Sequence, residues 1–222
     1  MSIQRMEGKH PVTGKKNSRA DFMKFDCTGV ILAGGKNSRL PGRKKTFQKV
    51  GNSMILENIS AIFASLFKET IIVVNEPREF ADLDMSIVTD IIPSKCALAG
   101  LHAGLFYASF PYAYVTACDT PFVNQSVIEH IVGQIEPGYD VIVPRTDDGL
   151  ESLSAVYSKD CIPLIEENLE KHIFMIKKFF RKKRVKEIPV EQLKKIDPQM
   201  QFIFNVNTPE DLKKARLMAD NR

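Results

Sequence analysis

The sequence predicts a single α/β domain in which helices cover both faces of a mostly parallel, twisted sheet, giving three layers. Short runs rich in valine and isoleucine alternate with helical stretches from Thr28 onward, which is the pattern of a parallel sheet with covering helices. These runs lack strict apolar and polar alternation, as expected when both sheet faces are covered. With 222 residues, 44% of them hydrophobic, the chain is long enough for one packed core.

The strand and helix signals follow one another along the chain. We expect strands at residues 28–33, 70–75, 85–89, 112–117, 140–144 and 153–157, and a late strand at 202–205. Apolar spacing predicts a helix over 54–67. A second helix is expected over 124–134 with Asn124 as N-cap, and a third begins at Thr208, which a proline follows. In such sheets ligands bind beyond the carboxyl ends of the strands, where the strand order reverses.

The charge excess belongs to the first 25 residues. The net charge is +4, and residues 26–222 carry 25 basic and 25 acidic groups. A body without net charge lacks the electrostatic footprint of non-specific nucleic-acid binding, so no nucleic-acid partner is expected. Residues 1–25 lack the apolar core of a signal peptide and are interpreted as a flexible leader or an expression remnant, with a short docking arm as the alternative. Residues 26–222 form the expected domain.

Cysteine spacing and hydropathy indicate the compartment. Cys27, Cys96, Cys118 and Cys161 are far apart and form no CxxC pair, which favours free thiols in a reducing compartment and argues against zinc. The apolar runs are far shorter than the ~20 residues of a membrane helix. We therefore expect a cytoplasmic protein without a membrane partner, most simply a monomer.

A loop rich in glycine and cations, GGKNSRLPGRKK, directly follows the first expected strand. Glycine lets backbone N–H groups approach phosphate oxygens, and Arg39, Arg43, Lys44 and Lys45 would offset phosphate charge. The P-loop and GxGxxG fingerprints are both absent. The loop predicts an oligophosphate site, and a solvated basic turn is the alternative.

Two aspartates follow expected strands at the edge where a parallel sheet presents its site. Asp90 follows MSIVT, and Asp119 follows YAYVTAC. Magnesium takes one or two carboxylates together with phosphate oxygens and water. We therefore predict Mg²⁺ on Asp119, with a turn or helix-capping role as the alternative.

Four segments resemble, in the same order, the signatures of the nucleotidyltransferases that include molybdenum cofactor guanylyltransferase. They are LAGGKNSRLPGRKK, DIIPSKCALAGLHAGL, TACDTPF and FNVNTPEDL, and the resemblance spans residues 28 to about 215. It implies a Rossmann-like nucleotidyltransferase fold and transfer of GMP from GTP to molybdopterin with release of pyrophosphate, with Mg²⁺ as cofactor. It also implies proteins of molybdenum cofactor biosynthesis, or the enzymes that receive the cofactor, as partners.

The same resemblance implies residue roles. Arg39, Lys45 and Asp119 would be catalytic, with Asp119 holding the metal. Nucleotide binding would fall to Leu32, Ala33, Gly34, Gly35, Lys45, Asn75, Asp90, Gly100 and Asp119. Asn205 and Asn207 would orient the metal or the acceptor, and Lys171 and His172 are weaker candidates for the acceptor phosphate.

This chain departs from those signatures at several positions. Lys44 stands where an aspartate is usual and Pro41 where a glycine is usual, so the phosphate lysine is either Lys44 or Lys45. In the second segment, two glycines and a proline of the signature are replaced by Ser94, Cys96 and Ala97.

Residues 171–186 hold eight lysines and arginines between apolar residues. We interpret them as an amphipathic helix with its aromatics inward, and the alternatives are a nucleic-acid or membrane surface and a contact to the acceptor phosphate. His102 and His130 fall in helical patterns and are assigned core or surface roles.

Two other functions compete with the guanylyl transfer. One is a nucleotidyltransferase that uses CTP or another NTP on a different phosphorylated acceptor. The other is a non-catalytic nucleotide- or nucleic-acid-binding protein, against which the neutral body and the two strand-end aspartates argue.

Overall fold

The computed structural model describes residues 24–34, 47–83 and 85–221, and in these ranges the chain forms one eight-stranded sheet in the order β10-β7-β9-β6-β1-β4-β5, with β8 paired to β7. The strands are β1 (Phe25–Leu32), β4 (Phe67–Val73), β5 (Ser86–Val88), β6 (Tyr112–Ala117), β7 (Val141–Thr146), β8 (Gly149–Leu150), β9 (Ser154–Ser158) and β10 (Val185–Pro189). A separate antiparallel hairpin joins β2 (Lys49–Val50) to β3 (Ser53–Met54).

The sheet is mostly parallel, as predicted. β6, β1, β4 and β5 run in one direction, and β10 is parallel to β7. β9 is antiparallel to both β6 and β7. The chain moves from β1 outward to β4 and β5 and then returns to place β6 on the other side of β1, so the strand order reverses between β1 and β6.

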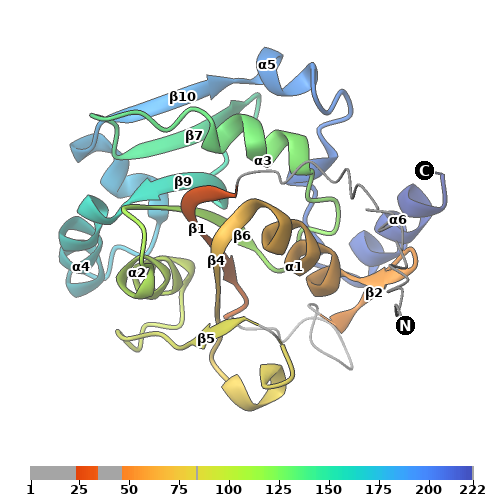
Figure 1. The fold of residues 1–222 in the computed structure, drawn as a ribbon, viewed down its shortest axis with the longest axis horizontal. Coiled ribbons are helices and arrows are strands. Elements are labelled where there is room, and N and C mark those ends of the chain that lie inside the picture. Colours follow the sequence, from red (N-terminus) through yellow and green to blue (C-terminus); the bar gives the residue numbers. More distant parts are fainter. Residues whose placement is uncertain (1–23, 35–46, 84, 222) are drawn as a thin grey trace, which may run out of the picture.

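Helices cover both faces of this sheet (Figure 1). The α-helices are α1 (Ile55–Leu66), α2 (Ala97–Tyr107), α3 (Gln125–Val132), α4 (Ile162–Glu170), α5 (Val190–Lys194) and α6 (Pro209–Asp220). Short 3-10 helices are η2 (Pro77–Phe80), η3 (Lys159–Cys161), η4 (Ile176–Lys182) and η5 (Gln201–Ile203). One face packs against α1, α3 and α6, and the other packs against α2, α4 and η4, which confirms the three-layer arrangement.

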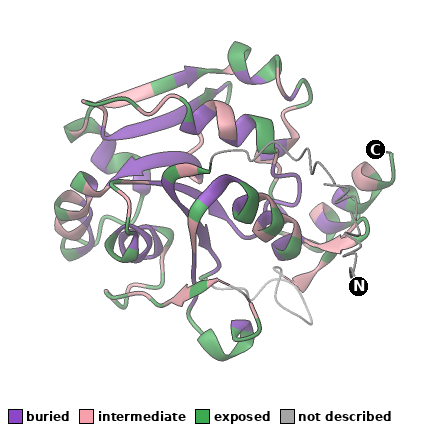
Figure 2. Ribbon diagram, viewed as in Figure 1, coloured by how far each residue is buried: buried purple, intermediate pink, exposed green. Residues whose placement is uncertain are grey.

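The strands are apolar on both sides because both faces are covered. On β1, the adjacent residues Val30 and Ile31 are both fully buried, and they belong to the cores on opposite faces. Figure 2 shows buried positions concentrated in the strands and on the inner sides of the helices. The lack of apolar and polar alternation in the sequence therefore has a direct structural cause.

The six earlier strands and the three predicted helices are confirmed, with small shifts at their ends. The Asn124 side chain accepts a hydrogen bond from the Val127 N–H at 3.3 Å and caps α3. The Thr208 hydroxyl accepts one from the Asp211 N–H at 3.1 Å and caps α6. Both caps satisfy N–H groups that a helix N-terminus leaves without a partner.

The predicted late strand at 202–205 is wrong. That segment contains η5, which follows Met200 in a left-handed conformation with φ of 51°. Its backbone groups bond locally instead of joining a ladder, since the Phe202 N–H donates to an Asp197 carboxylate oxygen at 3.0 Å. The Val206 N–H, just beyond, donates to the Asp119 carbonyl at 2.8 Å.

The predicted amphipathic helix over 171–186 is also wrong as a continuous element. The chain turns at His172, where φ is 56°, and η4 then buries Ile176, Phe179 and Phe180. β10 follows because β7 offers an open edge for pairing. The inward placement of the aromatics is thus confirmed for Phe179 and Phe180 but not for Phe174, which is exposed.

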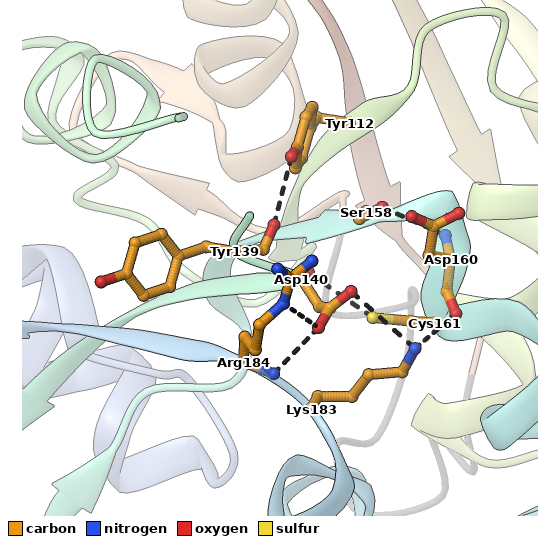
Figure 3. Close-up of polar contacts among 8 residues, drawn as sticks. All are labelled: Tyr112, Tyr139, Asp140, Ser158, Asp160, Cys161, Lys183 and Arg184. Atoms are coloured by element: carbon orange, nitrogen blue, oxygen red, sulfur yellow. Dashed lines mark hydrogen bonds and ion pairs between the residues drawn. The ribbon is translucent and has the colours of Figure 1, made fainter. Parts of the chain in front are cut away.

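Two cations of this segment turn toward a buried carboxylate and fix the start of β10 (Figure 3). Asp140 accepts the Arg184 backbone N–H at 2.8 Å, and Lys183 Nζ lies 3.9 Å from its other carboxylate oxygen. Lys183 also donates to the Asp160 carbonyl at 2.6 Å. Part of the basic segment therefore braces the sheet edge and is not free to bind an anionic partner.

Candidate active site

A pocket of about 320 Å³ lies at the carboxyl ends of the parallel strands. It is lined by residues at the ends of β1, β4 and β6 and by the loops that follow β5 and precede α6. This is the point between β1 and β6 where the strand order reverses, which is where an open α/β sheet forms its ligand site. The lining residues are Leu32, Gly34, Val73, Asp90, Lys95, Cys96, Ala97, Gly100, Ala117, Cys118, Asp119, Leu153, Asn205 and Asn207.

Seven of the predicted site residues meet in this pocket. Leu32 and Gly34 come from the end of the first strand, Asp90 and Gly100 from the second signature segment, and Asp119 from the third. Asn205 and Asn207 arrive from the fourth, at the far end of the chain. Four segments that are distant in sequence therefore contribute to one cavity.

Backbone hydrogen bonds hold these strand ends in register beyond the strands themselves. The Cys118 N–H donates to the Leu32 carbonyl at 3.0 Å, and the Ala33 N–H donates to the Val73 carbonyl at 2.8 Å. Ala33 is buried and does not line the pocket. Its backbone aligns the end of β1 with β4, and its predicted contact with the nucleotide stays a prediction.

The C-terminal segment clamps the Asp119 loop. Besides the bond from Val206 to the Asp119 carbonyl, the Thr120 hydroxyl donates to Asn205 Oδ1 at 3.0 Å. Because a side chain on a clamped loop loses little conformational freedom on binding, this arrangement preorganises Asp119 and Asn205.

Asp90 sits half-buried in the pocket wall. Desolvation by burial raises the pKa of Asp90, and the nearby His102 lowers it to a smaller extent. His102 is buried on α2, where its Nε2 lies 2.9 Å from Glu166 Oε1 on α4. This contact ties α2 to α4.

The donor set fits a hard divalent cation. Two carboxylates, Asp90 and Asp119, and the two side-chain amides of Asn205 and Asn207 line one cavity, and oxygen ligands of this kind suit magnesium. No cluster of three or more histidines, cysteines or acidic residues that could hold a metal occurs in the described ranges. A site that relies on one or two carboxylates and on substrate phosphates needs no such cluster.

Other predicted site residues lie outside the pocket lining. Asn75 is adjacent to it, since its side-chain amide lies 3.3–3.5 Å from the point where a Cβ on Gly34 would sit. Lys171 and His172 are exposed at the end of α4 and do not line the pocket. Gly35, Arg39, Lys44 and Lys45 fall outside the described residues.

Sequence reasoning missed several lining residues. Lys95, Cys96 and Ala97 form the turn into α2, and Leu153 precedes β9. Their residue types do not by themselves indicate a binding role. Only the residues of the turn before α2 could have been predicted to line the pocket, because this turn lies between Asp90 and Gly100 in the second signature segment.

None of the helices in the described ranges combines the length and apolarity needed to cross a bilayer.

Known proteins are similar to this chain in sequence and in fold. The profile of the MobA-like NTP transferase domain matches residues 29–187. The molybdenum cofactor guanylyltransferase of Desulfosudis oleivorans is 38% identical over 188 residues, which are 85% of this chain and 93% of that protein. A probable molybdenum cofactor guanylyltransferase of Pelotomaculum thermopropionicum is 39% identical over 89% of this chain and 95% of its own length.

A solved structure agrees with this likeness. The molybdopterin-guanine dinucleotide biosynthesis protein A of Archaeoglobus fulgidus superimposes with a TM-score of 0.77 and 27% identity. The match covers 88% of this chain and all of the other. The pocket thus lies within a fold that the two proteins share over nearly their whole length.

Proposed function

The chain belongs to the family of MobA-like NTP transferase domains, and we propose on this premise that its pocket transfers GMP from GTP to molybdopterin, forming the guanine dinucleotide cofactor and releasing pyrophosphate. The observation that carries the proposal is the convergence of Asp90, Gly100, Asp119, Asn205 and Asn207 on one cavity. These residues come from three of the four signature segments, and the fold brings them together.

The reaction is a substitution at the α-phosphorus of GTP. An oxygen of the acceptor phosphate forms the new bond to that phosphorus, the bond to the bridging oxygen of the β-phosphate breaks, and pyrophosphate leaves with the electron pair. No protein nucleophile is required. The protein contributes placement of the two substrates and stabilisation of charge on the transferring group.

The pocket's own residues divide this work. Leu32, Val73 and Ala117 are apolar lining residues at the strand ends, and an apolar surface suits a flat base. Asp119 and Asn205 add polar groups to the same cavity. The loop cations Arg39 and Lys45, with Lys44 as the alternative lysine, are proposed to neutralise the triphosphate.

We propose Asp119 as the ligand of a magnesium ion, with Asp90 able to contribute a second carboxylate. A bound Mg²⁺ would supply positive charge to the triphosphate oxygens and to the leaving pyrophosphate. The hydrogen bond from Val206 to the Asp119 carbonyl and the bond from Thr120 to Asn205 hold these two lining residues in place before substrate arrives. Lys171 and His172 stay proposals for the acceptor phosphate, as do a monomeric state and a cytoplasmic location.

Replacement of Asp119 tests the assignment. Asp119→Ala should abolish Mg²⁺-dependent release of pyrophosphate from GTP and molybdopterin, because the metal loses its carboxylate, while the melting temperature stays close to that of the wild type. Asp148→Ala removes an exposed carboxylate outside the pocket and should leave turnover unchanged. Near-normal turnover of Asp119→Ala would refute the metal assignment.

A nucleotide panel separates the proposal from its rivals. GTP should give faster pyrophosphate release than CTP, ATP or UTP with molybdopterin as acceptor. A preference for CTP would indicate a related transferase. Salt-sensitive RNA or DNA binding without pyrophosphate release would indicate a non-catalytic nucleic-acid-binding protein.

A further inference from the structure

Lys95 is a cation in the pocket that none of the signature residues accounts for. It lies on the turn between β5 and α2 and lines the cavity together with both carboxylates, Asp90 and Asp119. Among the described residues it is the one cationic side chain in that lining. It is exposed and makes no ion pair or hydrogen bond through its side chain with any described residue.

The backbone of Lys95 is held in a conformation that a lysine adopts at a cost. Its φ is 43°, in the left-handed region, where a Cβ is crowded and glycine is preferred. The turn is fixed around it, because the Ser94 N–H donates to the Ile92 carbonyl at 2.7 Å, and the Gly100 N–H donates to the Cys96 carbonyl at 3.1 Å. A charged side chain kept at a strained position inside a pocket indicates a role for the side chain itself.

The charges of the cavity indicate what that role is. Asp90 and Asp119 alone would repel a polyanionic substrate, since like charges at close range in a partly desolvated site interact strongly. An ammonium group with three donors and no partner offsets this repulsion and suits a phosphate oxygen. Lys95 also lies directly before α2, whose N-terminus has no side-chain cap and carries partial positive charge.

We propose that Lys95 binds a phosphate group of the substrates and serves as a substrate-binding cation on the wall formed by the turn before α2. The proposal rests on the nucleotidyl transfer proposed above and adds a contact to it. The phosphate can belong to the nucleotide or to the acceptor, and the two sources are separated by experiment.

Three substitutions and one control test the role of Lys95. Lys95→Gln removes the charge, Lys95→Arg keeps it, and Lys95→Gly removes it while relieving the left-handed strain. Lys195→Gln changes the net charge equally at an exposed position outside the pocket. GTP and guanosine affinities are measured by calorimetry, together with the KM for molybdopterin and the melting temperature.

If Lys95 contacts a nucleotide phosphate, Lys95→Gln and Lys95→Gly should weaken GTP binding about tenfold or more, leave guanosine binding unchanged, and be largely rescued in Lys95→Arg. If it contacts the acceptor phosphate, the KM for molybdopterin should rise by that factor while GTP affinity stays constant. Lys95→Gly should melt at the same temperature as the wild type or slightly higher, because glycine tolerates the backbone conformation.

Unchanged GTP affinity together with unchanged KM for molybdopterin would overturn the proposal, as would equal losses for GTP and guanosine, which would indicate a packing role. An equal effect of Lys195→Gln would overturn it too, by showing a dependence on net charge alone. These outcomes are distinct from a failure of the proposed function, in which the wild-type protein itself would bind no nucleoside triphosphate. If the wild type prefers another triphosphate, the same comparison is made with that nucleotide.

Discussion

Two glycines on α2, one helical turn apart, should respond in opposite ways to substitution by alanine. A Cβ on Gly100 would lie 3.4 Å from Leu32 Cδ2 and 3.9 Å from Asp90 Oδ1, which is ordinary contact. A Cβ on Gly104 would lie 2.5 Å from Val30 Cγ1, well inside the ~3.5–4.0 Å of a normal carbon contact. Val30 is fully buried in the middle of β1 and, being β-branched, has little freedom to rotate away.

The expected magnitudes follow from these distances. Alanine within a helix is favoured over glycine by about 0.5–1 kcal/mol, so Gly100→Ala should raise the melting temperature by about 2–4 °C for each kcal/mol gained in a chain of this size. In Gly104→Ala, the same gain is outweighed by overpacking, which costs about 1–3 kcal/mol. This variant should therefore melt below the wild type.

Nucleotide binding should be impaired in the stabilised variant, Gly100→Ala, and not in the destabilised one, Gly104→Ala. The new methyl of Gly100→Ala lies between Leu32 and Asp90 in the pocket wall, so nucleotide binding should weaken about tenfold, equivalent to ~1.4 kcal/mol. Gly104 does not line the pocket, and the folded Gly104→Ala protein should bind GTP as the wild type does. Calorimetry and thermal unfolding measure both effects. Undiminished GTP binding by Gly100→Ala, or destabilisation equal to that of Gly104→Ala, would refute this account of α2.

The remaining predictions concern titration and reactivity. Because burial raises the pKa of Asp90, its carboxylate destabilises the folded state at neutral pH. Asp90→Asn should accordingly increase the free energy of unfolding at pH 7. The gain should shrink as the pH falls toward the ordinary aspartate pKa of ~3.9 and vanish below about pH 3, where Asp90 is protonated in both states. A gain that stayed constant in thermal unfolding at several pH values would contradict this. Burial also raises the pKa of Cys27 and of Cys161 to about 12, so neither forms the reactive thiolate near neutral pH. Iodoacetamide should label the half-exposed Cys96 before Cys27 and Cys161, and GTP should slow the labelling of Cys96 because Cys96 lines the pocket. The labelling is followed by mass spectrometry. Equal labelling of the three cysteines, or no protection of Cys96 by GTP, would count against the site.

Much of the fold could be predicted from local sequence because the determinants are local. The apolar runs of β1, β4 and β6 have no alternative to burial on both faces, and the caps at Asn124 and Thr208 act within three residues of themselves. The failures were segments whose state depends on particular contacts that apolar patterning does not reveal. Residues 202–205 look like a strand, but the Phe202 N–H donates to the nearby Asp197 carboxylate, and the Val206 N–H donates to the Asp119 carbonyl, which is far away in the sequence.

The sequence by itself determined the chemistry available to this protein: strand-end aspartates, a cation-rich loop and four ordered signature segments, which together indicated nucleotidyl transfer. Tertiary structure alone decided which of these groups share a cavity. Asn205 reaches Thr120 across 85 positions of chain, and Lys95 lines the pocket because the turn that connects β5 to α2 passes along it. Such contacts depend on where the strand order reverses, and reversal is a property of the assembled sheet that no single segment encodes.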